Sequence, residues 1–309
     1  MRRAAAALAA LAALAAAGCG LGAGAPPGGV TLTVTKDFGA GPVVDEANPK
    51  RAGDETVMRL LQRNAQVRTR FGGGFVQAID GVSGGRRGGR PLDWFFYVNG
   101  IESDKGAGDT RVHDGDRIWW DRHDWSAAMR VPAVVGAYPE PFLHGVDGKR
   151  LPVRIECGRP GSRVCGQVAR ALGDAGVTAG EGAVGSSTGP ELLRVLVGPW
   201  PTLRPDDTVR ALEGGPRASG VYARIAPDGR TLAALNERGR VARRLGPRTG
   251  LVAATRGPGQ QPTWVVTGTD AAGLAAAARA FAGGESALAG KFALAVSADR
   301  ALALPLVAR

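Results

Sequence analysis

The stretch GDRIWWDRHDW, residues 115–125, gathers side chains that could do chemistry. It holds three tryptophans, three aspartates, two arginines and one histidine in eleven residues. Asp121, His123 and Asp124 could supply metal ligands. His123 stands alone, however, because His113 and His144 are not spaced from it as ligands usually are. The pattern therefore predicts no metal site.

Catalytic motifs are also missing from the sequence. There is no Gly-x-Ser-x-Gly elbow, which would present a nucleophilic serine. The glycine-rich RFGGGFV, residues 70–76, lacks the Lys-Ser/Thr that follows in a phosphate-binding loop. We therefore predict a protein that is not an enzyme and that holds no cofactor.

Two aromatic segments, residues 92–99 and 116–123, have the alternation of strands, in which neighbouring side chains point to opposite faces. One face is mainly apolar and is expected to pack on a helix. It carries Leu92, Trp94, Phe96, Val98, Ile118 and Trp120. The other face mixes rings with polar groups and is expected to be partly exposed. It carries Asp93, Phe95, Tyr97, Asn99, Arg117, Trp119, Asp121 and His123.

The elements around these strands indicate a small sheet crossed by one helix. VTLTVT, residues 30–35, alternates apolar residues with threonines and predicts a half-buried strand. Asp54 could cap a helix in which Val57, Leu60 and Leu61 recur at helical spacing. One helix on a small mixed sheet is the layout of a β-grasp domain.

Four segments within residues 30–125 then suggest a family. ETVMRLLQRNA, FGGGFVQAIDG, DWFFYVNG and VHDGDRIWW occur in that order. Together they resemble the transcobalamin C-terminal-like domain, also described as domain of unknown function 4430. The resemblance implies a soluble-ligand-binding β-grasp domain over residues 30–145. Animal members pair it with a helical barrel and hold cobalamin between the two, but this chain has no run of helical hairpins.

The resemblance and the mixed face together predict a site for a small soluble ligand, cobalamin-like or of another class. The rings would stack on the ligand and the polar groups would orient it. The predicted residues are Phe95, Tyr97, Asn99, Arg117, Trp119, Asp121 and His123. Two alternatives stay open. A second domain could cover this face, or the chain could be a non-catalytic scaffold that docks another envelope or transporter protein there.

Residues 150–300 alternate strand and helix patterns and predict an α/β layered domain of unassigned family. LLRVLVGPW predicts a strand, and Asp270 is expected to cap a helix over residues 271–282. A hairpin is expected around Asp228 and Gly229, which would make the sheet partly antiparallel. The whole chain is therefore expected to be α+β.

The first residues predict export to the cell envelope. Residues 1–19 have the basic, apolar and small-residue layout of a secretory signal, and Cys19 after Ala-Ala-Gly resembles a bacterial lipoprotein's lipidated cysteine. Residues 20–29 would then tether the protein to the membrane, where it could act as an accessory to vitamin uptake. Plain secretion is the alternative. Cys157 and Cys165 are left as an even pair that could form a disulfide in an oxidising compartment.

The formal charge of +11 raises the question of nucleic acid binding. Five of the 39 basic residues are lysines, so 34 are arginines, and they are scattered along the chain. A nucleic-acid interface needs basic residues clustered on one face. The distribution therefore predicts no nucleic acid partner.

Overall fold

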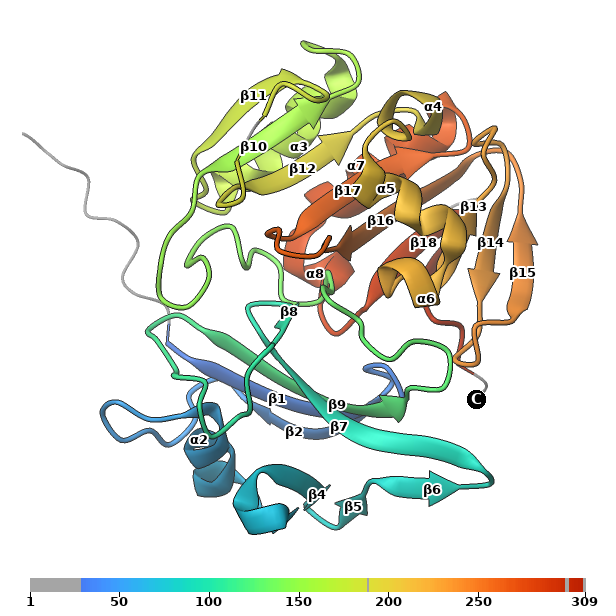
Figure 1. Ribbon diagram of the computed structural model, residues 1–309. Helices are drawn as coiled ribbons and strands as arrows, with labels where there is room; N and C mark the ends of the chain where they lie inside the picture. The colour runs from blue at the N-terminus through green and yellow to red at the C-terminus, as the bar shows by residue number, and fades with distance from the viewer. Residues whose placement is uncertain (1–28, 188, 298–299, 308–309) are drawn as a thin grey trace, which may run out of the picture.

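The computed structural model describes residues 29–187, 189–297 and 300–307 of the 309-residue chain. The fold is α+β, as the sequence predicts. A six-stranded sheet in the N-terminal part packs below a seven-stranded sheet in the C-terminal part (Figure 1). Two further three-stranded sheets complete the strand pairing of the described residues.

The N-terminal unit is built on a mixed sheet in which the strand order is β2-β1-β9-β7-β6, with β8 beside β7. β1 and β9 run parallel and the other pairs are antiparallel. A second sheet has the order β3-β4-β5. The elements are β1 (Thr31–Lys36), β2 (Gly41–Glu46), α2 (Val57–Asn64), β3 (Val67–Arg70), η1 (Phe71–Gly73), β4 (Phe75–Ile79), β5 (Val82–Ser83), β6 (Gly85–Arg87), β7 (Arg90–Val98), β8 (Ile101–Glu102) and β9 (Arg117–Asp124).

The apolar face of this sheet packs on α2, as the alternation predicts. Leu60 and Leu61 of the helix are fully buried in one cluster with Trp94, Ile118 and Trp120 of the sheet. Burial of each large side chain stabilises the fold by about 1.5–3 kcal/mol, so this cluster accounts for the helix position.

The predicted cap of α2 was wrong by two residues. Thr56, and not Asp54, has the extended backbone of an N-cap, and its hydroxyl accepts a hydrogen bond of 3.4 Å from the Arg59 amide. Asp54 lies outside the helix, where its exposed carboxylate is 4.0 Å from an Arg111 nitrogen. A threonine oxygen caps a first turn in the same way as an aspartate. Thr56 is the cap because it directly precedes the helix, whereas Asp54 lies two residues earlier.

A segment without strands or long helices, residues 125–152, joins the two units and includes the predicted boundary at 145–150. It is nevertheless well packed, because Val134, Val135 and Tyr138 are almost completely buried. Val134 donates a backbone hydrogen bond to Gly100, and Val135 donates one to Phe292. The segment therefore contacts both units along its length.

The C-terminal unit is built on the sheet β11-β10-β12-β17-β16-β18-β19, in which the first four strands are parallel and the last three are antiparallel to their neighbours. Its elements are β10 (Val153–Cys157), α3 (Arg163–Asp174), β11 (Ala179–Ala183), β12 (Leu193–Val197), α4 (Trp200–Leu203), α5 (Asp207–Arg210), η2 (Ala211–Gly214), α6 (Pro216–Ser219), β13 (Ala223–Ile225), β14 (Leu232–Leu235), β15 (Val241–Leu245), β16 (Thr249–Thr255), β17 (Thr263–Gly268), α7 (Ala271–Ala282), α8 (Gly284–Leu288), β18 (Ala293–Ser297) and β19 (Arg300–Leu304).

Both faces of the central strands of the seven-stranded sheet are buried. Val195 and Val266 belong to a core cluster with the residues of α3 and α7 that face the sheet. Leu196 and Val265, their neighbours in the sequence, belong to a second cluster on the opposite side. Strands buried on both faces are expected to be continuously apolar, and LRVLV and TWVVT fit that expectation.

The local signals of this unit are mostly confirmed. Asp270 caps α7 by accepting a hydrogen bond of 2.7 Å from the Gly273 amide, and the helix spans the predicted residues. The hairpin around Asp228 and Gly229 is also present, between β13 and β14. It does not join the main sheet, however, but forms a separate sheet with β15. The antiparallel part of the main sheet comes instead from β16, β18 and β19.

The predicted disulfide is confirmed. Cys157 at the end of β10 is bonded to Cys165 in the first turn of α3, with the two Cα atoms 6.0 Å apart. Both residues are buried, at 1% and 0% exposure. The bond therefore fixes the start of α3 against the central sheet.

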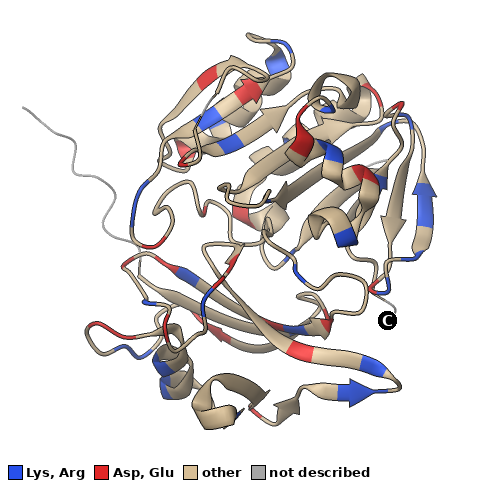
Figure 2. Cartoon of the chain, in the orientation of Figure 1, with Lys and Arg blue, Asp and Glu red and all other residues tan. Residues whose placement is uncertain are grey.

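The predicted signal, Cys19 and almost all of the predicted tether lie outside the described residues. Within the described residues, no helix has the length and apolar character needed to cross a membrane. Basic residues are spread over both units and are interspersed with acidic ones (Figure 2).

We predict that removing the disulfide lowers the free energy of unfolding by about 2–3 kcal/mol, the loop-closure value for a bond with a sequence separation of 8 residues. The test is urea unfolding of the Cys157→Ala/Cys165→Ala double variant against the oxidised parent. A reducing agent should destabilise the parent by a similar amount and leave the variant unchanged. Equal stability of parent and variant would contradict the prediction.

Candidate functional site

The mixed face of the N-terminal sheet is covered by the C-terminal unit. Phe292, immediately before β18, lies edge-on to four rings that belong to the N-terminal unit. Its ring centroid is 5.2 Å from Phe38, 5.7 Å from Tyr97, 5.2 Å from Trp119 and 5.5 Å from His123. The rings share one core cluster with residues of β12, β16 and β17. Most of the mixed face is therefore covered by a second domain, which is one of the two alternatives left open by the sequence.

The expected exposure of these side chains was wrong. Tyr97 is 0% exposed and Trp119 4%, and Asp121 and His123 are 0% and 2% exposed. Phe95 is half-buried and stacks on His123. The alternation of β7 and β9 sorts the side chains correctly by face, but it does not reveal that a second apolar surface covers the mixed face.

Asp121 is the polar centre of this buried face. Its carboxylate accepts hydrogen bonds from the Phe38 and Gly39 amides, at 3.1 and 2.8 Å, and from the Thr35 hydroxyl at 2.5 Å. The Trp119 indole in turn donates to the Thr35 hydroxyl at 2.8 Å. A buried carboxylate requires such partners, so Asp121 holds the turn after β1 against β9.

His123 is a further hydrogen-bond partner of the Asp121 carboxylate. Its Nδ1 lies 2.9 Å from Asp121 Oδ1. The imidazole is stacked between Phe38 and Phe95, with ring centroids 4.6 and 4.4 Å away. The pair is therefore enclosed by rings and has no open side on which a ligand could sit.

Asn99 and Arg117 sit at the end of the face that lies nearest α8. Asn99 is buried at a positive φ of 55°, and its amide donates to Asp116 and to the Gly145 carbonyl. It therefore holds a turn. Arg117 is only half-buried, and its guanidinium forms a 2.7 Å ion pair with Glu285 of α8 across the boundary between the units.

One edge of the mixed face stays open. A groove of about 480 Å³ runs between β1 and β2 on one side and α8 with neighbouring loops on the other. Because β1 pairs with β9 in parallel, Thr31, Thr33 and Thr35 lie beside Arg117, Trp119 and Asp121 on the same face. Thr31, Thr33, Thr35, Arg117 and Trp119 all line the groove. Two of the seven predicted site residues are thus part of an accessible pocket.

Glycines allow the backbone to approach the closed end of this groove. A Cβ on Gly39 would lie 2.1 Å from the Gly290 carbonyl oxygen and 3.2 Å from the Trp119 ring. One on Gly136 would lie 2.7 Å from both Trp119 and the Lys291 amide. Trp119 is therefore enclosed by main chain, and only its remaining edge borders the groove.

The buried Tyr97 phenol is held neutral rather than activated. Burial raises the pKa of the Tyr97 phenol well above its usual value, and the nearby carboxylates of Glu102 and Asp121 raise it further. Among the described residues, no partner lies within hydrogen-bond distance of the Tyr97 hydroxyl. Tyr97 therefore contributes packing and not acid–base chemistry.

Possible metal ligands gather at one place in the described parts of the chain, away from the mixed face. Cys157, Cys165 and the exposed Glu181 lie close enough to share an ion. The two sulfur atoms are bonded to each other, however, so they are not thiolate ligands in this structure. At the end of β9, Asp124 pairs with Arg90 at 2.8 Å.

The geometry is that of an α+β module whose mixed face meets a second unit, with a groove at their edge. Residues 54–124, which include α2 and all the strands from β3 to β9, match the model of a family described as a domain of unknown function, DUF4430. The match supports the part of the resemblance that concerns this family. No curated protein and no solved structure matches the chain.

Several residues of the groove were not predicted from the sequence. The threonines of β1 were assigned to the polar side of a strand, but their place beside Arg117 and Trp119 depends on the parallel pairing of β1 with β9. The alternation in VTLTVT was the available signal. Glu285 and Phe292 carry no such signal, because their roles arise from contacts about 170 residues away in the sequence.

We predict that Asp121→Asn destabilises the protein strongly, whereas Tyr97→Phe has little effect on stability. Asn replaces one accepting oxygen by a donor that faces other donors, so the free energy of unfolding should fall by about 3 kcal/mol or more. Tyr97→Phe removes a hydroxyl without a protein partner and should change stability by less than about 1 kcal/mol. Urea unfolding measures both. A large loss from Tyr97→Phe would show that the hydroxyl has a role in this face.

Proposed function

We propose that this chain is an extracytoplasmic, lipid-anchored protein that binds a small soluble ligand in the groove between its two units. The observation that carries the proposal is the groove itself, where the threonine row of β1 lies beside Arg117 and the edge of Trp119. In this proposal the binding residues lie at the edge of the mixed face, and Tyr97 and Asp121 are packing that supports them.

The size and lining of the groove suit such a ligand. Small-molecule sites commonly enclose about 300–1,000 Å³ and combine apolar walls with a few polar groups. Here the walls include Val44 and Ala137, and the polar groups are threonine hydroxyls, the Arg117 guanidinium and the carboxylates of Asp45 and Glu285. Hydroxyls both donate and accept, whereas a guanidinium only donates. The two carboxylates only accept. The lining therefore favours a compact polar ligand that has both donors and acceptors.

The position of the groove supports recognition by two surfaces. Thr31 and Thr33 belong to the N-terminal unit, and Ala289 and Gly290 follow α8 in the C-terminal unit. The Arg117–Glu285 ion pair crosses between them. A ligand in the groove would contact both units at once. The resemblance to the transcobalamin C-terminal-like domain favours a vitamin, and the groove has room for a compact one or for part of a corrinoid.

The anchor and the compartment are inferred from chemistry at two places. Cys19 follows a signal-like segment, and lipidation there would hold the protein at the membrane by a tether over residues 20–29. The disulfide between Cys157 and Cys165 supports an oxidising compartment outside the cytoplasm. A ligand-binding protein held there would act as an accessory to uptake by a transporter. The proposal includes no catalytic step.

We predict that Thr33→Val weakens ligand binding about fivefold, the effect of about 1 kcal/mol for one lost hydrogen bond. The measurement is tryptophan fluorescence of the full-length protein against a panel of vitamins and corrinoids. Thr69→Val, a strand threonine outside the groove lining, is the matched control and should bind like the parent. Trp119→Phe should abolish the signal, whereas Trp125→Phe should not.

Two results would contradict this assignment. One is that no compound of the panel changes the fluorescence of the parent. The other is that Thr69→Val weakens binding as much as Thr33→Val, which would mean that the ligand does not sit in the groove.

Docking of another envelope protein is the second candidate, and a specific surface favours it. Phe71 is 86% exposed and Phe75 38% exposed, and their rings contact each other edge-on at 6.3 Å in the turn between β3 and β4. This aromatic tip, Phe71 and Phe75, lies on the N-terminal unit away from the groove. Exposed aromatic pairs often anchor protein interfaces.

We predict that the two candidates separate in a pull-down from membranes with the full-length protein as bait. A stoichiometric protein that is lost with Phe71→Ser/Phe75→Ser supports docking through the aromatic tip. A small molecule that co-purifies and is lost with Thr33→Val supports binding in the groove. The double serine variant should lose little stability, because Phe71 is largely in solvent and Phe75 is exposed over more than a third of its surface.

A further inference from the structure

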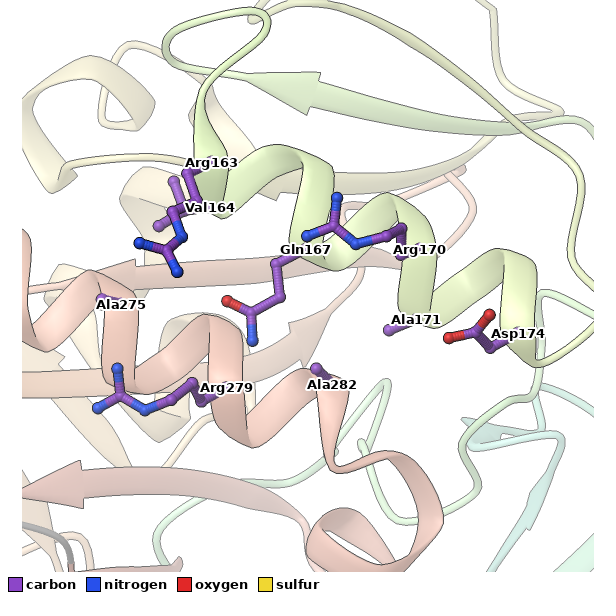
Figure 3. Close-up of a pocket in the computed structure, with 9 residues that line it drawn as sticks. All are labelled: Arg163, Val164, Gln167, Arg170, Ala171, Asp174, Ala275, Arg279 and Ala282. Carbon is purple, nitrogen blue, oxygen red and sulfur yellow. The ribbon is translucent and has the colours of Figure 1, made fainter.

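A second groove lies on the far side of the C-terminal unit, between α3 and α7. Its volume is about 530 Å³, and the two helices that form it pack against each other on the same face of the seven-stranded sheet. Figure 3 shows the helices side by side with their lining side chains. Small residues, among them Ala171 and Ala275, lie between the helices and leave the groove open.

Three arginines border this groove. Arg163 and Arg170 come from α3, and Arg279 comes from α7. In the described parts of the chain, no carboxylate forms an ion pair with any of the three. Elsewhere in the same unit, by contrast, Arg194 pairs with Glu156 at 2.7 Å. The three guanidiniums therefore present unused donors to the same space.

Local geometry brings the Arg170 guanidinium towards the first turn of α3. Gly166 leaves room for the Arg170 side chain to fold back, so that its Nη1 would be 3.4 Å from a Cβ at position 166. Figure 3 shows the Arg170 guanidinium lying over this part of the helix, with the Gln167 amide extending from α3 towards α7. The lining carboxylate, Asp174, is at the opposite end of α3.

The start of α3 adds to the positive potential. Its N-cap, Ser162, makes no side-chain hydrogen bond to the first turn, and that turn contains no acidic residue. The N-terminus of a helix carries a partial positive charge and free amide donors. An arginine at that position is unfavourable unless an anion is near. The start of α7 is different, because Asp270 already satisfies its Gly273 amide.

From these observations we propose that the groove between α3 and α7 binds a ligand that carries at least two phosphate groups. Arg170 is seven positions after Arg163 in α3, a rise of about 10 Å. The folded-back Arg170 side chain brings its guanidinium nearer to Arg163 than that rise. An arginine fork can donate two hydrogen bonds to a phosphate, and Arg279 lines the same groove from the other helix. The ligand is either a free diphosphate-bearing compound or the headgroup of a phospholipid with two phosphates.

The test is calorimetric titration of the full-length protein with inorganic pyrophosphate. Arg170→Gln and Arg279→Gln should each weaken binding about tenfold, and binding should fall as salt is raised. Arg244→Gln is the matched control, because Arg244 is exposed on β15 and is not part of the groove. It should change the affinity less than twofold. All three residues are exposed, so thermal unfolding should match the parent.

The two sources of phosphate are separated with phosphatidylcholine vesicles that do or do not contain cardiolipin. Cardiolipin-dependent binding that Arg279→Gln removes, without binding of pyrophosphate, identifies a lipid headgroup. Binding of pyrophosphate with the same sensitivity identifies a free ligand. The proposal is overturned if neither probe binds, or if Arg244→Gln reduces binding as much as Arg279→Gln, since the attraction would then be diffuse.

Discussion

The contact of Phe292 with the mixed face of the N-terminal sheet determines the arrangement of the whole molecule. One ring from the C-terminal unit lies edge-on to Phe38, Tyr97, Trp119 and His123. Each such aromatic pair contributes about 0.5–1.5 kcal/mol beyond the area that it buries. Because the four partners come from three segments of the N-terminal unit, they fix both the position and the orientation of the second unit on the sheet.

This contact is compatible with polar groups only because those groups bond to one another. Asp121 would be costly to bury alone, yet Thr35, Gly39 and His123 lie around its two oxygens. The Trp119 indole also finds its acceptor in Thr35. Polar and aromatic residues that could have formed an exposed site therefore form an interface, in which hydrogen bonds select one arrangement and rings supply the buried area.

Much of the fold could be predicted from local sequence patterns. The alternation in β7 and β9 identifies which residues share a face, and Asp270 marks the start of α7 correctly. What covers a face could not be predicted in this way. Phe292 is separated from Trp119 by more than 170 residues, and nothing in its immediate neighbourhood indicates that it will meet a sheet. Strand periodicity reports on a strand's own pleat and carries no information about a distant partner.

The candidate groove exists because the C-terminal unit covers only part of the mixed face. The threonines of β1 continue the mixed face beyond Trp119, because the parallel pairing of β1 with β9 brings Thr33 beside it. The C-terminal unit covers the rings, whereas beside β1 and β2 it leaves a groove. The rings are therefore sealed and Thr35 is buried beside them, whereas Thr31 and Thr33 are only half-buried and border the groove. A polar row on a rigid sheet, bordered by a second unit that meets it only at one side, is the kind of place where a ligand can replace water and contact both units.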